Sequence, residues 1–180
     1  KVEEMIEIKT VDDPESPDFS PDGKKIVFAG LQGAVGDLFV LDLDTKQITN
    51  LTKDNFADSG PTWSPDGKYI VYVARVSGNE KLFKVDAATG MKTQITFGTH
   101  DDAAAQFVDD DTLVFSSTAT DPNQPIDPDV ARNGNIYNIW TLNLKNGELR
   151  ASGRSGCAAC SYRASIALIL AICRSGTCRC

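Results

Sequence analysis

Residues 1–150 contain no cysteine, and residues 151–180 contain no acidic residue. All five cysteines lie in the second segment together with four Arg, which gives that segment a net charge of +4. The first segment holds 14 Lys and Arg against 25 Asp and Glu, a net charge of −11. Such an acidic body repels phosphate backbones, which disfavours nucleic-acid binding. The break in composition indicates two segments of different origin or role.

The sequence also lacks any run of 18 apolar residues, which argues against a transmembrane helix and against membrane insertion. Its longest apolar run, residues 166–173, is too short to span a bilayer. The chain starts at Lys1 without a basic-then-apolar signal region, so we expect either a removed leader or an internal piece of a longer chain. With 41% apolar and 24% charged residues, 180 residues suffice for about one domain with a buried core.

A repeat with a spacing of 44 residues is the strongest pattern present. The motif Pro-x-aromatic-Ser-Pro-Asp-Gly-Lys occupies residues 17–24 and returns at residues 61–68. Its aromatic residue, Phe19 and then Trp63, recurs once more as Phe107, where three Asp replace the Pro-Asp-Gly turn. In the first two copies Pro suits the second position of a type I turn and Gly the fourth, while Ser can bond back to the backbone. The motif therefore predicts a tight corner between two strands.

Each motif is followed by short runs rich in β-branched and aromatic residues, which favour strands, and residues 1–150 show no helical period. Four short strands per repeat predict an all-β chain, a partial β-propeller of three four-stranded blades with an irregular Cys-rich tail. We expect the repeat aromatics to wedge between neighbouring blades. The predicted organisation is a terminal segment, three blades and a tail: 1–13 (a strand from a preceding blade, or a frayed terminus), 14–54, 55–98, 99–150 and 151–180.

The repeat resembles that of the TolB-type β-propeller family over roughly residues 14–150, through the motif, the Ile-Val-aromatic strand, Leu-Phe-x-x-Asp and the closing apolar-Thr pair. The resemblance implies a six-bladed propeller that is periplasmic or secreted and acts as a non-catalytic platform for protein interaction. Similar repeats form the gating propeller of tricorn-like and prolyl-oligopeptidase-like serine peptidases, whose catalytic residues lie in another domain. That peptidase role is the alternative interpretation.

Three blades leave two open flanks, whereas closed propellers have four to eight blades. We therefore expect a fragment that needs a protein partner. The favoured partner is the remaining blades of a longer chain, and pairing with a second copy is the less favoured one.

The third blade carries about 14 extra residues within a loop insertion at 116–137. Its Pro and Gly residues predict a loop, and a solvated excursion is the favoured interpretation over a binding loop. Asp121, Asp127 and Asp129 offer oxygen ligands for Ca²⁺, but they do not match an EF-hand loop, so surface carboxylates are the preferred reading.

His100, the single histidine, lies close to Asp102, a proximity that also occurs in catalytic triads. The chain contains no Gly-x-Ser-x-Gly elbow, and Asp102 aligns with Asp58 in the preceding repeat. We therefore expect a structural role for this pair, with no catalytic residue, no cofactor-binding residue and no cofactor.

The tail departs from the repeat, since Ser152-Gly153 stands where an apolar-Thr pair is expected. The first hypothesis is that residues 151–180 are not native to the fold. The second is a zinc site, for which Cys157 and Cys160 have the spacing of half a site and Cys178 and Cys180 are weak candidates for the rest. The third is a redox or disulfide element, although five cysteines leave at least one thiol unpaired within the chain.

Overall fold

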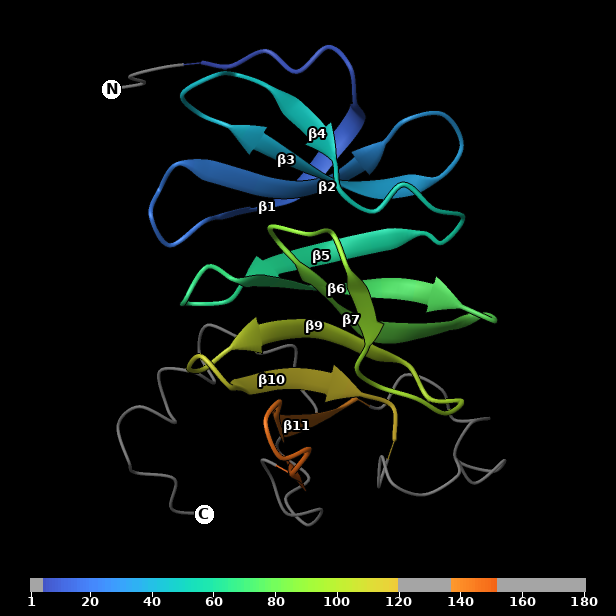
Figure 1. Cartoon of the computed structure of the whole chain (residues 1–180). Helices are drawn as coiled ribbons and strands as arrows, with labels where there is room; N and C mark the ends of the chain where they lie inside the picture. Colours follow the sequence, from blue (N-terminus) through green and yellow to red (C-terminus); the bar gives the residue numbers. More distant parts are fainter. Residues whose placement is uncertain (1–4, 120–136, 152–180) are drawn as a thin grey trace.

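The computed structural model describes residues 5–119 and 137–151, which form strands and no helix (Figure 1). The strands are β1 (Asp12–Phe19), β2 (Lys25–Leu31), β3 (Gly36–Asp42), β4 (Ile48–Asn50), β5 (Asp58–Trp63), β6 (Tyr69–Val76), β7 (Asn79–Asp86), β8 (Lys92–Gln94), β9 (Asp102–Phe107), β10 (Thr112–Ser117), β11 (Asn138–Asn143) and β12 (Leu149–Ala151). The predicted all-β class is confirmed. Within these two ranges the structure has no helix of the length and hydropathy that crossing a membrane requires.

The strands make three antiparallel four-stranded sheets, each built from strands consecutive in the chain. We call them blade 1 (β1–β4), blade 2 (β5–β8) and blade 3 (β9–β12). Figure 1 shows the three blades stacked in chain order, each sheet against the next. The partial propeller predicted from the repeat is therefore confirmed.

The Ser-Pro-Asp-Gly corner has the predicted geometry in both copies. In blade 1 the Gly23 amide donates to the Ser20 carbonyl at 2.8 Å, which closes the turn, and the Lys25 amide donates to Ser20 Oγ at 2.9 Å. Gly23 has a φ of 69°, a left-handed conformation that favours glycine. Ser64 and Gly67 close the corner of blade 2 in the same way, at 2.9 Å.

The third corner uses a carboxylate in place of this motif. Asp109 Oδ1 accepts the amides of Asp111 and Thr112 at 2.9 and 2.8 Å. These backbone hydrogen bonds stabilise the ionised form and lower the pKa of Asp109 below its ordinary value. The Asp109 carboxylate therefore accepts backbone amides as the Ser20 hydroxyl does in blade 1, and the third turn forms without Pro or Gly.

Apolar side chains fill the two seams between blades. Seam 1–2, between blades 1 and 2, contains Val27 and Leu38 from one sheet and Ile70, Tyr72 and Trp63 from the other. Seam 2–3 is built in the same way, by Val71, Val73 and Leu82 of blade 2 against Leu113, Phe115 and Trp140 of blade 3. Because side chains alternate along a strand, blade 2 contributes opposite faces to the two seams.

Two of the three repeat aromatics lie where the sequence predicts. Trp63 is 8% exposed within seam 1–2, and Phe107 packs against the core of seam 2–3. The prediction is wrong for Phe19, which is 60% exposed. The described residues place no sheet against it, since blade 1 is the first of the stack.

The outer face of blade 1 is covered by residues 5–11, which form no strand. Val11 is buried with Phe28 and Phe39, and Ile6 and Ile8 pack against the same cluster. This segment covers a face of blade 1 that no other described sheet packs against, while Phe19 stays exposed.

Phe19 and Trp63 form a matched pair, because they occupy the same repeat position in different surroundings. We expect Trp63→Ala to lower the free energy of unfolding by about 3–5 kcal/mol, the usual cost of emptying a buried aromatic site. Phe19→Ala should change it by at most about 0.5 kcal/mol, as is usual at the surface. Urea unfolding followed by circular dichroism measures both, and equal losses would contradict the seam assignment.

Candidate functional site

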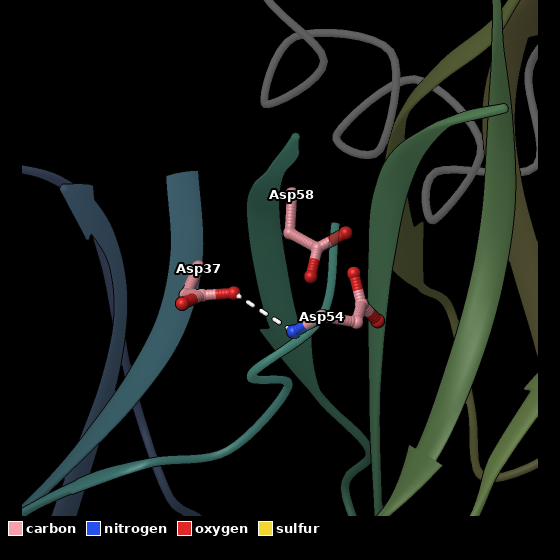
Figure 2. A group of neighbouring side chains, drawn as sticks. All are labelled: Asp37, Asp54 and Asp58. Atoms are coloured by element: carbon pink, nitrogen blue, oxygen red, sulfur yellow. Dashed lines mark hydrogen bonds between the residues drawn. The ribbon is translucent and has the colours of Figure 1, made fainter. Parts of the chain in front are cut away.

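Charged side chains gather near the start of the third strand of one blade and of the first strand of the next blade, at equivalent points of the two seams. In seam 1–2 these are Asp37 near the start of β3, Asp54 in the loop after β4 and Asp58 at the start of β5. We call these three residues the acidic cluster. One carboxylate oxygen of each lies within 4.8 Å of the others. Figure 2 shows their carboxylates converging between the two blades.

Local hydrogen bonds hold Asp37 in place. Asn50 Nδ2 donates to Asp37 Oδ2 at 2.7 Å, and the Asp54 amide donates to Asp37 Oδ1 at 3.4 Å (Figure 2). Thr52 Oγ1 donates to Asp37 Oδ1 at 3.4 Å and accepts the Leu38 amide at 3.0 Å. The fourth strand and the loop that leads to blade 2 are thus tied to β3 through one carboxylate.

Asp54 has a cationic partner. Lys92 Nζ lies 2.6 Å from Asp54 Oδ2 and donates to the Thr52 carbonyl at 2.7 Å. Both side chains of this ion pair are partly exposed. The Lys92 ammonium therefore neutralises Asp54 at the exposed side of the cluster. It leaves the negative charges of Asp37 and Asp58 without an ion-pair partner.

Asp58 is the deepest member, at 4% exposed, and neither of its carboxylate oxygens has a hydrogen-bond partner in the described structure. Burial raises the pKa of Asp58 to about 7, against the opposing effects of the nearby Thr52 hydroxyl and the Lys92 charge. The negative charges of Asp54 and Asp37 act in the same direction as burial. Burying an unpaired carboxylate is costly, so such a group takes up a proton or a cation.

In seam 2–3 a lysine side chain neutralises the equivalent buried carboxylate. Lys81 Nζ lies 3.0 Å from Asp102 Oδ2 and also donates to the His100 carbonyl. His100 Nε2 lies 3.3 Å from the same carboxylate oxygen, and all three residues are buried. Burial pushes the pKa of Asp102 up, but hydrogen bonding to His100 and the charge of Lys81 outweigh it, so that the pKa is lowered.

The repeat relates the two seams residue by residue. Lys81 follows Asp37 by 44 residues, and Asp102 follows Asp58 by the same interval. Asp58 and Asp102 are therefore equivalent carboxylates, one without and one with an ammonium group beside it. The alignment of Asp58 with Asp102 is visible in the sequence, but the meeting of Asp58 with Asp37 and Asp54 is not, because it depends on how the loop after β4 folds back.

The structure describes only one of the other groups of candidate site residues predicted from the sequence, the pair His100 and Asp102. His100 and Asp102 do lie together and are buried, and Lys81 binds both the Asp102 carboxylate and the His100 carbonyl. The calcium candidates Asp121, Asp127 and Asp129 lie outside the described residues. So do the zinc candidates Cys157, Cys160, Cys178 and Cys180, and the tail hypotheses remain predictions.

Comparison with known families and structures agrees with this architecture. The sequence family described as the TolB beta propeller domain matches residues 8–149. TolB from Acinetobacter baumannii is 21% identical, with a TM-score of 0.61, over 80% of this chain and 33% of that protein. A second TolB structure, from Agrobacterium tumefaciens, is 22% identical with a TM-score of 0.65, over 79% and 50%. The chain thus spans a third to a half of the length of these two structures.

Enzymes share the same architecture. A puromycin hydrolase is 17% identical with a TM-score of 0.59, over 76% of this chain and 21% of that protein. At such identities the likeness concerns the fold alone. A comparison with curated proteins finds no match.

The two seams should respond differently to pH. In a metal-free buffer the folded state keeps a proton on Asp58, flanked by Asp37, Asp54 and Lys92, that the unfolded chain releases above its ordinary pKa of 3.8. As pH rises from about 4.5 to 7, this group should reduce the free energy of unfolding by up to about 1.4 kcal/mol per pH unit, with no further loss above 7. Chemical unfolding at several pH values, compared with Asp58→Asn, isolates the effect. An identical slope in both proteins would contradict the raised pKa.

Lys81 should be essential to seam 2–3. Lys81→Met leaves Asp102 buried without its cation and should cost about 3–5 kcal/mol of stability. Adding Asp102→Asn removes the uncompensated charge, so the double variant should recover much of that loss. Urea unfolding of the single and double variants measures the coupling, and additive losses would show that the two groups act independently.

Proposed function

Because the chain belongs to the TolB β-propeller domain family, we propose that it is a non-catalytic scaffold for protein–protein interaction in the bacterial cell envelope. Family membership supports this role, since the TolB structures have the same sheet architecture. The location that follows from the family is periplasmic or secreted. In the catalytic alternative the catalytic residues belong to another domain, and the buried His100–Asp102 pair is bound to Lys81 in the interior of seam 2–3.

The single observation that carries the proposal is the exposure of Phe19. This residue occupies the repeat position at which Trp63 and Phe107 pack against a neighbouring sheet, yet it is 60% exposed. Its backbone lies at the end of β1, beside the corner formed by Ser20 and Gly23. A protein that places an apolar sheet face against blade 1 would bury Phe19 as blade 1 buries Trp63.

The second candidate is a gating propeller of a larger serine peptidase. The observation that favours it is the similarity of the puromycin hydrolase fold, whose TM-score of 0.59 is close to the 0.61 of the Acinetobacter TolB. In that case the surface beside Phe19 would meet further blades or a catalytic domain of the same polypeptide. The two candidates differ in what lies against blade 1, and one measurement addresses both.

Photo-cross-linking from position 19 tests the proposal. A photoreactive phenylalanine analogue replaces Phe19 in the chain expressed in the bacterial periplasm, and Met91 is replaced as the control because it is 68% exposed but lies in the turn before β8 of blade 2. We expect a discrete adduct with another envelope protein from position 19 and none from position 91. Adducts to a peptidase domain would favour the second candidate, and equal labelling from both positions would contradict a specific surface.

A further inference from the structure

The acidic cluster differs from its counterpart in seam 2–3 by the absence of a built-in cation at the repeat position of Lys81. There the ammonium lies between the two blades, within 3.0 Å of the Asp102 carboxylate. In seam 1–2 that position is Asp37, so the change of one residue replaces a positive charge by a negative one beside an equally buried carboxylate. A seam that repeats this packing needs the buried Asp58 carboxylate to be neutralised from another source, by a proton or by a bound cation.

Lys92 does not supply it. Its ammonium is committed to Asp54 at 2.6 Å and to the Thr52 carbonyl at 2.7 Å, at the more exposed side of the cluster. Asp37 is satisfied by neutral donors, the Asn50 amide and the Thr52 hydroxyl, which leave its charge in place. Neither carboxylate oxygen of Asp58 has a hydrogen-bond partner in the described structure, and the nearby Thr52 hydroxyl and Lys92 charge offset its burial only in part. Asp58 is 4% exposed and points toward the other two carboxylates (Figure 2).

We propose that Asp37, Asp54 and Asp58 bind one Ca²⁺ ion between blades 1 and 2, in the role that the Lys81 ammonium has between blades 2 and 3. The three carboxylate oxygens lie within 4.8 Å of one another, a spacing that lets a single ion with Ca–O distances of about 2.3–2.6 Å contact all three. The buried, unpartnered Asp58 carboxylate is the group that such an ion neutralises.

The donor set selects the metal. All three ligands are carboxylate oxygens, which suit hard cations, whereas zinc prefers histidine and cysteine. Mg²⁺ demands near-octahedral geometry and retains several waters, which a site closed by Asp37 and Asp58 admits poorly. Ca²⁺ tolerates irregular geometry, and water at the exposed Asp54 side completes its shell.

Bound Ca²⁺ would join three segments, and it would add to the seam packing and to the hydrogen bonds that already link Asp37 to the loop. Asp37 lies on β3 of blade 1, Asp54 lies in the connecting loop and Asp58 begins β5 of blade 2. The ion therefore fixes the position of blade 2 against blade 1 and stabilises the folded chain through its selective affinity for that arrangement. This inference does not depend on the proposed scaffold function.

Isothermal titration calorimetry of the full 180-residue chain, stripped with EDTA and returned to chelator-free buffer at pH 7.5, provides the test. We expect a binding heat with Ca²⁺ at one ion per chain, at least tenfold weaker binding of Mg²⁺, and a rise in the melting temperature with Ca²⁺. Asp58→Asn should weaken Ca²⁺ binding at least tenfold while the strand content seen by circular dichroism is unchanged. The absence of any Ca²⁺ heat with the unmodified chain would overturn the proposal.

Asp37→Lys is the sharper variant, because it installs the residue of the second seam. It should abolish Ca²⁺ binding and melt at a higher temperature than the unmodified chain in EDTA, since the lysine neutralises Asp58 as Lys81 neutralises Asp102. The control is the triple variant Asp121→Asn, Asp127→Asn, Asp129→Asn, which removes the other calcium candidates and should bind Ca²⁺ normally. Binding that survives Asp58→Asn but is lost in the triple variant would overturn the assignment to the seam.

Discussion

The packing of each sheet against the next is the interaction on which the rest of this structure depends. A single four-stranded sheet of this chain has two apolar faces, and neither can be buried within the sheet itself. Blade 2 shows the solution, because Tyr72 faces blade 1 while Val71 and Val73 face blade 3. The interval of 44 residues matters for this reason, since it returns the same apolar residues to the same depth in each seam.

Polar groups within the seams follow from the same repetition. The loop from one blade to the next must pass the edge of a seam, and it carries acidic side chains to equivalent places, as Asp58 and Asp102 show. In that low-dielectric setting a carboxylate needs a partner, and the two seams differ in how they provide one. Hydrogen bonding to His100 and the charge of Lys81 lower the pKa of Asp102 in spite of its burial, whereas burial, together with two further carboxylates, raises that of Asp58.

The sequence contained enough information for the fold because the fold is local. The Ser-Pro-Asp-Gly corners and the alternation of Ile26 to Phe28 each act within a few residues, and the interval of 44 residues shows where each unit begins. The strands and the sheet order could therefore be predicted. The acidic cluster could not, because Asp37 and Asp58 belong to different blades and meet through a loop whose path no motif encodes. The repeat position of Phe19 predicts burial, but burial at this position also requires a neighbouring sheet. No described sheet lies against Phe19, and the residue is exposed.

Comparison of the two seams shows how a repeat protein can replace the ammonium group of a lysine side chain by another source of positive charge. The hydrophobic contacts around Trp63 and around Phe115 are similar in kind, so the backbone geometry of a seam is set without reference to the charged site. The residue at the position of Asp37 and Lys81 is then free to vary, provided that the buried carboxylate opposite is neutralised. A lysine at this position neutralises the carboxylate permanently. An aspartate makes the neutralisation depend on a proton or a cation from solution, and this is the case in seam 1–2.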